Sequence, residues 1–336
     1  MRMIPLSLAL AGLAVAAEQK PFDATGSAAL TTSQGKPNIV LILADDLGYG
    51  DVQCLNPSRG KIPTPNLDKL AGQGMVFTDA HSSASVCTPT RYGLLTGRYN
   101  WRTRLQSGVM GVYEEPLIAA DRLTVAEMLK RQGYATGCIG KWHLGMHAPG
   151  ETEETMRRKT AASPHRGNTW LKAASVTDID WTKPIIDGPL TRGFGYYFGM
   201  DFPNGPPFCF IENDRTVGIP SATLDVTDVK AKYEMGLPAG LPAVTNWDIE
   251  AVLPTLTDKA CDFIRQNATA GPSTGSGHGR PFFLYFPMTS PHTPTAPSKE
   301  WQGKSGLGKY GDFVMETDGM VGRILAALEE CGVAGD

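Results

Sequence analysis

Short apolar runs along the chain alternate with segments whose apolar residues recur at helical spacing. Residues 38–43 (Asn-Ile-Val-Leu-Ile-Leu) form a continuous β-branched run, which is typical of a strand buried on both faces of a parallel sheet. Residues 134–139 and 281–286 have a similar character, and residues 75–78 are short and apolar at their start. The pattern therefore predicts a strand at each of these four places.

Helical signals fill the intervals between the predicted strands. Amphipathic segments lie at residues 64–74, 124–133, 256–264 and 312–331. The first begins with Thr-Pro, a pairing typical of an N-cap and a first helical residue, and it ends at a glycine. The second begins with the capping box Thr-Val-Ala-Glu and also ends at a glycine. Alternation of this kind predicts the α/β class, with a mostly parallel sheet and helices on both faces.

Some stretches depart from the alternation. Residues 151–181 are polar without clear periodicity and are expected to form an insertion near the site. Residues 267–280 are rich in Gly and Ser, predict a surface loop, and begin with the glycosylation pattern Asn-Ala-Thr. Residues 194–210 are aromatic and Pro-rich and could line a pocket. After the last predicted helix this architecture expects another strand, yet the sequence stops at Asp336.

Composition and charge narrow the class of protein. The 336 residues are 41% hydrophobic and 19% charged, which favours a folded chain with a sizeable core. The net charge of −3 excludes a strongly basic nucleic-acid binder. Residues 1–17 resemble a signal peptide, because Arg2 precedes an apolar run of about 13 residues and a small-residue cleavage site. That run is shorter than the ~20 residues a spanning helix needs, so we expect export without a stable membrane anchor.

Polar residues follow three of the predicted strands. Asp45-Asp46 ends the first strand, Lys141 and His143 follow the strand at 134–139, and His292 follows the strand at 281–286. In open α/β sheets ligands bind beyond the carboxyl ends of the strands, so these side chains are candidates for a site.

The two adjacent carboxylates have two interpretations. Buried side by side they repel each other, and a hard divalent cation such as Ca²⁺ or Mg²⁺ would compensate for that repulsion. Alternatively, Asp45 caps the following turn and Asp46 is solvated, because Asp-Asp-Leu-Gly is also ordinary turn chemistry.

Cys87 precedes a short predicted helix that contains Pro89 and Arg91. The free amides and the dipole at a helix N-terminus favour anions, and Arg91 lies about one turn away from Cys87. The segment therefore suggests an anion site, although most cysteines in such positions are buried and inert.

Four motifs together resemble those of the sulfatase family. Residues 87–91 (Cys-Thr-Pro-Thr-Arg), followed by Leu-Thr-Gly-Arg at 95–98, are similar to the signature C-x-P-x-R. Residues 38–48 resemble the opening strand and metal carboxylates of that family, residues 140–145 its second signature, and Pro291-His292 its third basic position. The resemblance extends from about residue 37 to the end of the chain.

The resemblance implies an alkaline-phosphatase-like α/β fold and a specific nucleophile. In such sulfatases a maturation enzyme oxidises the motif cysteine, here Cys87, to formylglycine, and the hydrated aldehyde attacks a sulfate ester. The metal ligands implied are Asp45 and Asp46, with the oxidised Cys87 beside them, and the cation is expected to be Ca²⁺, with Mg²⁺ as the alternative.

The resemblance also implies roles for the basic residues. Arg91 and Lys141 would offset the charge of the diol and the sulfate. His143 would act as the base that deprotonates the second hydroxyl of the diol. His292 would bind sulfate and help to protonate the leaving alcohol. For each histidine the alternative is a hydrogen-bonded structural residue, and for Lys141 a solvated surface lysine. The other four histidines lack comparable context and are expected on the surface or in loops; they are His81, His147, His165 and His278.

The expected organisation is a signal peptide at 1–17, a polar linker at 18–36 and a sulfatase catalytic domain at 37–336 that is incomplete. The resemblance to sulfatases also implies an Asp-Asn pair, a further lysine and a smaller domain, which are expected beyond Asp336. The predicted location is the periplasm, the cell exterior or, in a eukaryote, the secretory or lysosomal pathway. The predicted substrate is a sulfated carbohydrate or an aryl sulfate. The alternatives are a phosphate or phosphonate ester hydrolase on the same scaffold and a non-catalytic binder of sulfated glycans.

Overall fold

The structure, a computed structural model, describes residues 36–152, 179–202, 205–225, 227, 233, 240–269 and 280–335. A six-stranded sheet with the order β1-β8-β2-β3-β4-β5 lies at its centre. The first four strands in that order run parallel, and β4 and β5 add an antiparallel edge. This topology confirms the predicted mostly parallel α/β sheet. The strands of the sheet are β1 (Ile39–Asp45), β2 (Ala135–Lys141), β3 (Tyr196–Met200), β4 (Ile211–Glu212), β5 (Arg215–Thr216) and β8 (Phe282–Pro291).

The register brings the carboxyl ends of the long strands together. Asp45 at the end of β1 lies opposite Pro291 of β8. Lys141 at the end of β2 lies opposite Met200 of β3. Since the strands are parallel, the residues that follow each of them emerge at one edge of the sheet. The polar residues singled out in the sequence are therefore gathered on that edge.

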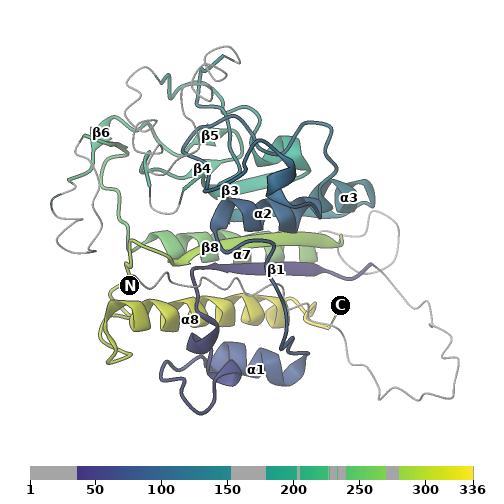
Figure 1. Ribbon diagram of the computed structural model, residues 1–336, viewed down its shortest axis with the longest axis vertical. Coiled ribbons are helices and arrows are strands. Elements are labelled where there is room, and N and C mark those ends of the chain that lie inside the picture. The colour runs from purple at the N-terminus through teal and green to yellow at the C-terminus, as the bar shows by residue number, and fades with distance from the viewer. Residues whose placement is uncertain are drawn as a thin grey trace, which may run out of the picture.

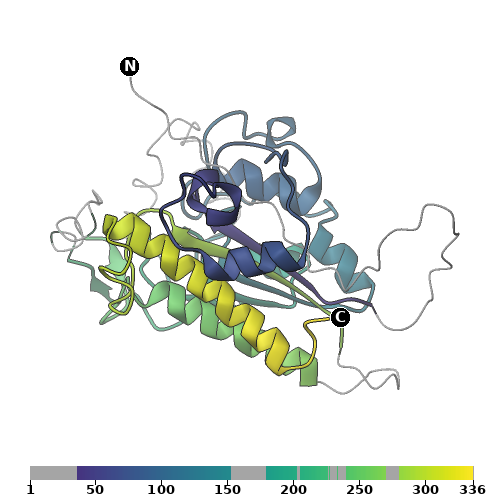
Figure 2. The ribbon, with the colours of Figure 1, turned by 90° about the horizontal axis from the view of Figure 1, so that it is seen from below.

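Helices cover both faces of the sheet, as the alternation predicts. In Figure 1 the sheet lies between α2 and α3 above and α8 and α1 below. Figure 2 shows α7 and α8 side by side on the same face, with α1 next to α8. The helices are α1 (Pro65–Gln73), α2 (Cys87–Thr96), α3 (Val125–Arg131), α7 (Val252–Thr269) and α8 (Gly308–Glu330). Four short 3₁₀ helices (Tyr49–Asp51, Gln53–Leu55, Asn100–Arg102 and Pro189–Arg192) and a small hairpin of β6 (Ala222–Thr223) and β7 (Pro242–Ala243) complete the described elements.

Side chains of β8 alternate between two hydrophobic cores. Phe283 and Tyr285 pack into the core under α2 and α3. Phe282, Leu284 and Phe286 pack on the opposite face against α7 and α8. Because both faces are covered, every position of the strand is buried rather than alternate ones, and residues 282–288 are apolar throughout. Burying each of these large side chains contributes roughly 1.5–3 kcal/mol, so the central strand is a firm support for the residues at its end.

The capping residues in the sequence correctly predicted where α3 begins and ends. The Thr124 hydroxyl accepts a hydrogen bond from the Glu127 amide at 3.0 Å, as the capping box predicts. After the helix ends, Gly133 adopts φ 91°, a conformation that favours glycine. Thr64 precedes Pro65 at the start of α1, also as predicted, but its side chain does not cap the helix. It instead accepts a hydrogen bond from the Gln53 amide at 2.9 Å.

Two predictions about strands were wrong. Residues 75–78 form no strand, and the side chains of Met75 and Phe77 are 66% and 60% exposed. A strand needs a neighbour for its backbone hydrogen bonds, and no strand in the described part of the chain pairs with this segment. Conversely, β3 occupies the start of the aromatic 194–210 segment, which was predicted only as a pocket lining. Its Tyr197 and Phe198 enter opposite cores.

Several predicted features fall outside the described residues or at their margins. The signal peptide, nearly all of the linker, His165, His278 and most of the 151–181 insertion lie outside them. Asn267, predicted at the start of a loop, lies instead in the last turn of α7, where its side-chain amide donates to the Phe263 carbonyl at 2.8 Å.

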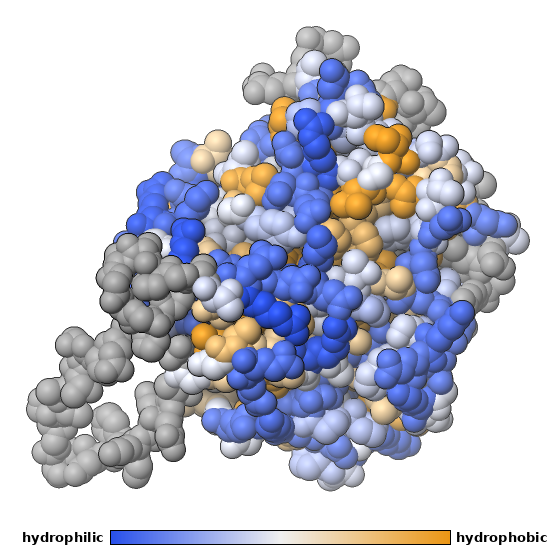
Figure 3. Space-filling view, turned by 180° about the vertical axis from the view of Figure 1, so that it is seen from behind, coloured by the Kyte–Doolittle hydropathy of each residue, from blue (hydrophilic) through white to orange (hydrophobic). Residues whose placement is uncertain are grey.

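Within the described ranges no helix has the length and apolar character needed to cross a membrane. Figure 3 shows, on the face opposite that of Figure 1, apolar residues in separate patches among hydrophilic ones.

Candidate active site

The residues predicted at the three strand ends lie together in the structure. The Lys141 ammonium at the end of β2 is 2.7 Å from the Asp45 carboxylate at the end of β1. His292, which follows β8, has its Nε2 3.6 Å from a carboxylate oxygen of Asp46. The ends of these three strands, which are distant in the sequence, therefore lie side by side at one edge of the sheet.

Glycines allow the strands to approach closely just before the site. A Cβ on Gly140, which precedes Lys141, would lie 2.0 Å from the Pro287 carbonyl oxygen. One on Gly199 would lie 1.9 Å from the carbonyl oxygen of Gly140. Gly140 also has φ 133°, a conformation that other residues rarely adopt. These positions therefore require glycine if Lys141 is to reach Asp45.

Asp45 is the electrostatic centre of the site. Its carboxylate accepts hydrogen bonds from Arg91 at 3.1 Å and from Lys141 at 2.7 Å, and all three side chains are almost fully buried. Burial alone would raise the pKa of Asp45, but the charges of Lys141 and Arg91 outweigh it and hold that pKa well below its usual range. Asp45 therefore stays ionised, and its carboxylate binds these two cations rather than capping the following turn, as the alternative interpretation had it.

Arg91 connects three elements. It lies on α2, donates to Asp45 on β1, and donates to the Lys141 carbonyl on β2 at 2.8 Å. Its guanidinium offers several donors in a rigid plane, which suits this bridging position. Lys141 is completely buried, so the alternative of a solvated surface lysine is wrong.

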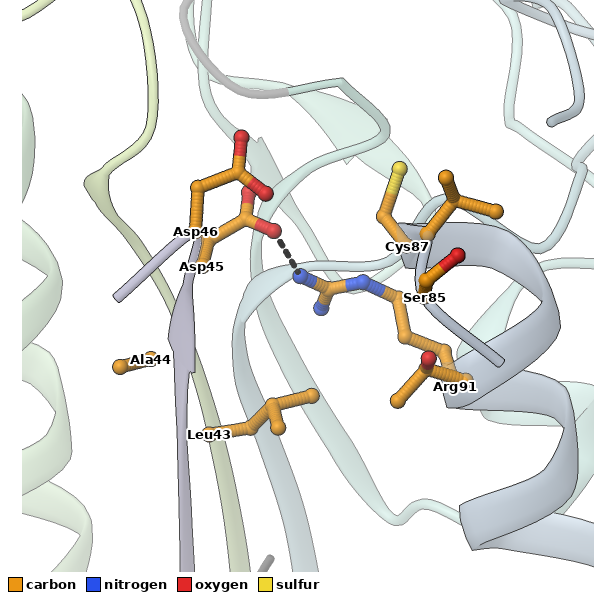
Figure 4. A pocket seen from close by; sticks show the side chains of 9 residues that line it. Leu43, Ala44, Asp45, Asp46, Ser85, Cys87 and Arg91 are labelled. Atoms are coloured by element: carbon orange, nitrogen blue, oxygen red, sulfur yellow. Dashed lines mark hydrogen bonds and ion pairs between the residues drawn. The ribbon is translucent and has the colours of Figure 1, made fainter. Parts of the chain in front are cut away.

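Cys87 is the first residue of α2, as the sequence predicts. It is half-buried and lines a small pocket together with Asp45, Asp46, Arg91 and neighbouring residues of β1 and α2. Figure 4 shows the Cys87 side chain on one wall of this pocket and the two aspartates on the facing wall. A half-buried thiol at a helix N-terminus beside buried cations differs from an inert core cysteine.

Asp46 differs from its neighbour in conformation and exposure. It adopts φ 63°, a left-handed conformation that Asp tolerates better than most residues. Its side chain is 46% exposed, against 5% for that of Asp45. The two adjacent carboxylates therefore have different environments, one held by two cations and the other open to the pocket beside His292.

His143 is completely buried just after β2. Its Nε2 lies 2.9 Å from the Met110 carbonyl oxygen, which can only accept, so Nε2 carries the proton. Nδ1 then bears the lone pair, and it has no hydrogen-bond partner in the described structure. Burial, followed by the charge of Lys141, lowers the pKa of His143 to about 3, so the ring is neutral at physiological pH.

Two residues after β3 belong to the same site and were not singled out from the sequence. Asp201 is buried and accepts from the Tyr113 amide at 3.3 Å. Burial raises the pKa of Asp201 to about 6, although His143 opposes that shift. Phe202 presents its ring 4.8 Å from that of His143 and 5.6 Å from the Lys141 ammonium. The aromatic character of residues 194–210 was the available signal, and it did not identify either position.

The other described histidines and the cysteines lie in a range of environments. His81 is exposed, and His147 lies in a loop, both within the prediction of surface or loop positions, but His147 is only 3% exposed and lies 3.9 Å from Asp187. A lone histidine between loops gave no local sign of burial. All six cysteines lie within the described residues and are free, so no disulfide forms there.

Comparison with known protein families identifies the family to which this chain belongs. A family model described as Sulfatase matches residues 37–336. This chain belongs to the sulfatase family. The sulfatase match covers the strand ends at Asp45 and Lys141 and the helix that begins at Cys87, and it begins where the resemblance in the sequence begins.

Named sulfatases are similar over most of this chain. It is 34% identical over 311 residues to N-acetylgalactosamine-6-O-sulfatase of Bacteroides thetaiotaomicron, over 88% of this chain and 56% of that protein. It is 33% identical over 304 residues to arylsulfatase A of Bos taurus, over 89% of this chain and 50% of that protein. The chain thus spans about half the length of these curated sulfatases.

Solved structures agree on the sulfatase fold. One from work on the metabolism of glycosaminoglycans by Bacteroides thetaiotaomicron superposes with a TM-score of 0.69 and 30% identity, over 89% of this chain and 60% of that one. A sulfatase from Pseudoalteromonas sp. superposes with a TM-score of 0.60 and 22% identity, over 89% of this chain and 53% of that one. The α/β fold predicted from the sulfatase motifs is confirmed.

The donor set can be tested against the divalent cation that the sulfatase family implies. Asp45 and Asp46 offer only oxygen atoms, which fits Ca²⁺ or Mg²⁺ rather than a softer metal. No cluster of three or more His, Cys, Asp or Glu side chains suited to a metal occurs among the described residues. Two carboxylates fit in chemistry but supply fewer ligands than the 6–8 oxygens that Ca²⁺ usually takes. The two carboxylates alone would therefore supply only part of the ligand shell of such a cation.

Proposed function

We propose that this chain carries the catalytic centre of a sulfatase that hydrolyses a sulfate ester through a formylglycine nucleophile made from Cys87. One observation supports the proposal most strongly. Cys87, at the first position of α2, faces a carboxylate pair and shares its pocket with a buried arginine, within a family of sulfatases. An inert structural cysteine would need none of these neighbours.

The proposed maturation enzyme oxidises the Cys87 side chain to an aldehyde: the C–S bond breaks, sulfur leaves as sulfide, and two electrons pass to an oxidant that the maturation enzyme uses. The hydrate of the aldehyde carries two hydroxyl groups. Cys87 is half-buried rather than buried, so its side chain is within reach of solvent. In the catalytic step one hydroxyl gives up its proton to solvent and attacks the sulfur atom of the substrate, the S–O bond to the alcohol breaks, and a sulfate ester forms on residue 87. Arg91 and Lys141 provide positive charge beside the site as the attacking oxygen and the sulfuryl group approach.

Release of sulfate requires the second hydroxyl. In the proposed step its proton passes to Nδ1 of His143, its electron pair forms the aldehyde C=O bond, and the C–O bond to sulfate breaks. The available lone pair on Nδ1 supports this role. His292, beside Asp46 at the open side of the pocket, is proposed to bind sulfate and to protonate the leaving alcohol.

The proposed cation is Ca²⁺, with Mg²⁺ as the alternative. Asp46 is more open to the pocket, while Asp45 is held by Arg91 and Lys141. Asp45, Asp46 and the oxidised Cys87 would contact the ion, which when bound would lower the pKa of the diol and polarise a sulfate oxygen.

A sulfated carbohydrate is the substrate class we propose, and a sulfated aryl compound is the alternative. The N-acetylgalactosamine-6-O-sulfatase to which the chain is 34% identical supports the carbohydrate. The composition of residues 1–17 supports export, which would bring the enzyme to extracellular or periplasmic glycans. In this organisation residues 18–36 link the signal peptide to a catalytic domain that starts at residue 37.

Rates on matched esters test this function. Protein produced with a maturation enzyme would be assayed on an aryl sulfate, the corresponding aryl phosphate and a 6-O-sulfated amino sugar, beside Cys87→Ala and the control Cys331→Ala. We expect sulfate ester cleavage by the parent and by Cys331→Ala but not by Cys87→Ala. Preference for the phosphate would favour the phosphoester hydrolase, and glycan binding without turnover by fully matured protein would favour the non-catalytic binder.

A further inference from the structure

Thr88, which follows the cysteine in the signature, makes its hydrogen bonds outside its own helix. Its hydroxyl donates to the His143 carbonyl at 3.0 Å and accepts from the Met110 amide at 3.2 Å. Thr88 is the second residue of α2, so the helix has no preceding turn to which its hydroxyl could bond. Here the partners lie 55 and 22 residues away along the chain, and Thr88 is completely buried.

The same three residues form a closed circuit. Nε2–H of His143 donates to the Met110 carbonyl at 2.9 Å, while the Met110 amide donates to Thr88 and Thr88 donates to the His143 carbonyl. Met110 and His143 are also buried. Each donor therefore has an acceptor within the circuit, and water does not compete for them.

The circuit fixes the imidazole as well as the backbone. With the Met110 carbonyl held in place, the proton stays on Nε2, and the lone pair stays on Nδ1. His143 has φ 51°, a left-handed conformation that is uncommon outside glycine, although histidine adopts it more often than most residues. The hydrogen bond from Thr88 to the carbonyl of that same residue helps to retain the conformation.

We propose that Thr88 is a positioning residue that couples the helix bearing the nucleophile at residue 87 to the tautomer and placement of His143. The inference rests on the proposed function, because it assigns His143 the removal of the second hydroxyl proton. Thr88 does not touch the substrate. It acts by holding Nδ1 as a proton acceptor during the step in which the C–O bond to sulfate breaks and the aldehyde forms again.

The opposite side of the imidazole has its own support. The edge of His143 packs against Phe202 at 4.8 Å, with the ring planes at 77°. That contact restricts rotation of the ring but does not distinguish Nδ1 from Nε2. The choice of tautomer therefore depends on the Met110 carbonyl, whose position depends in turn on Thr88.

A matched pair of substitutions tests the proposal. Thr88→Val has nearly the same shape as threonine but lacks the hydroxyl, and Thr88→Ser keeps the hydroxyl but lacks the methyl group. Both would be produced with a maturation enzyme, and the formylglycine content of each would be measured by peptide mass spectrometry. Rates would then be expressed per formylglycine, because residue 88 lies inside the segment that the maturation enzyme is proposed to recognise.

For Thr88→Val we expect kcat to fall roughly tenfold to a hundredfold, since small misplacements of catalytic groups have effects of that size. Because the slowed step is release, which follows formation of the sulfate ester, KM should fall together with kcat, and kcat/KM should change by no more than about twofold. If release is the slowed step, sulfate ester should accumulate on residue 87 and be visible by mass spectrometry. Thr88→Ser should retain most of the parent kcat.

A second readout does not depend on turnover. In protein with ¹⁵N-labelled histidine, long-range proton–nitrogen correlations report which ring nitrogen carries the proton, and His143→Gln assigns the signal. We expect His143 to be entirely in the Nε2–H form in the parent and in Thr88→Ser. In Thr88→Val we expect a mixture of the Nε2–H and Nδ1–H forms. An unchanged tautomer and kcat in Thr88→Val, or equal losses in Thr88→Val and Thr88→Ser, would overturn the inference. Absence of sulfate turnover in fully matured parent protein would instead overturn the proposed function, and the tautomer experiment would still decide the role of Thr88.

Discussion

Arg91 on α2 and Asp45 on β1 form a buried ion pair, with Nη2 3.1 Å from Oδ1. The pair joins the cysteine-bearing helix to the first strand across 46 residues of sequence. The same Asp45 carboxylate also binds Lys141, so positive charge is concentrated beside the pocket that Cys87 lines. A buried carboxylate with two cationic partners depends strongly on both of them.

Removing one cation should destabilise the fold. We expect Arg91→Ala to lower the free energy of unfolding by about 3–5 kcal/mol, because it leaves Asp45 buried with a single partner. Urea denaturation at pH 7 measures the change. Arg131→Ala is the matched control, since Arg131 pairs with Glu127 at 2.8 Å on an exposed helix surface. The control should lose less than about 1 kcal/mol, and equal losses for the two variants would contradict the importance of the buried pair.

The buried carboxyl of Glu316 predicts a pH dependence of stability. Burial raises its pKa from 4.5 to about 7, although the Ser298 amide opposes that rise. Because the folded pKa is the higher one, the folded state retains the proton between pH 4.5 and 7 while the unfolded chain loses it. The unfolding free energy of the parent should therefore fall across that window, by about 3 kcal/mol relative to Glu316→Gln.

Urea denaturation of both proteins at pH 5 and pH 8 measures this difference. Glu329→Gln serves as a control, since the Glu329 side chain is 57% exposed on the same helix, α8. Its difference from the parent should be nearly independent of pH. A Glu316→Gln difference that stays constant between pH 5 and pH 8 would show that Glu316 titrates normally.

Cation removal should affect both stability and activity. We expect a chelator to lower the melting temperature and the rate on sulfate esters, and Ca²⁺ or Mg²⁺ to restore both, because an ion that binds only the folded state stabilises it. At a hundredfold excess over Kd the stabilisation is about 2.7 kcal/mol. Asp46→Asn should weaken the response, whereas Asp79→Asn should not, since Asp79 is 90% exposed beside His81. If the chelator changed neither the melting temperature nor the rate, the proposal that Asp45 and Asp46 bind a cation would be contradicted.

Features encoded by neighbouring residues could be predicted from the sequence. The cap of α3 at Thr124 depends on a residue only three positions away, and the apolar run of β8 reflects burial of both its faces. Cys87 at the start of α2 follows from its neighbours in the same way. These predictions were confirmed because the information lies within one element.

Features that depend on distant partners could not be predicted in this way. Residues 75–78 have the composition of a strand but no neighbour within the described chain, and they stay exposed. Thr88, Asp201 and Phe202 owe their importance to contacts with His143, from which they are separated by tens of residues in sequence. Family motifs supplied the catalytic candidates, whereas the residues that support them emerged only from the structure.

The state of residue 87 in the purified protein is the most direct measurement of the central proposal. Tandem mass spectrometry of the peptide that contains Cys87 should be carried out on protein produced with and without a maturation enzyme. We predict an aldehyde in the matured sample, with a peptide mass about 18 Da lower than that of the thiol form, and sulfatase activity in proportion to its content. An intact Cys87 thiol in matured protein that cleaves sulfate esters at full rate would contradict the account.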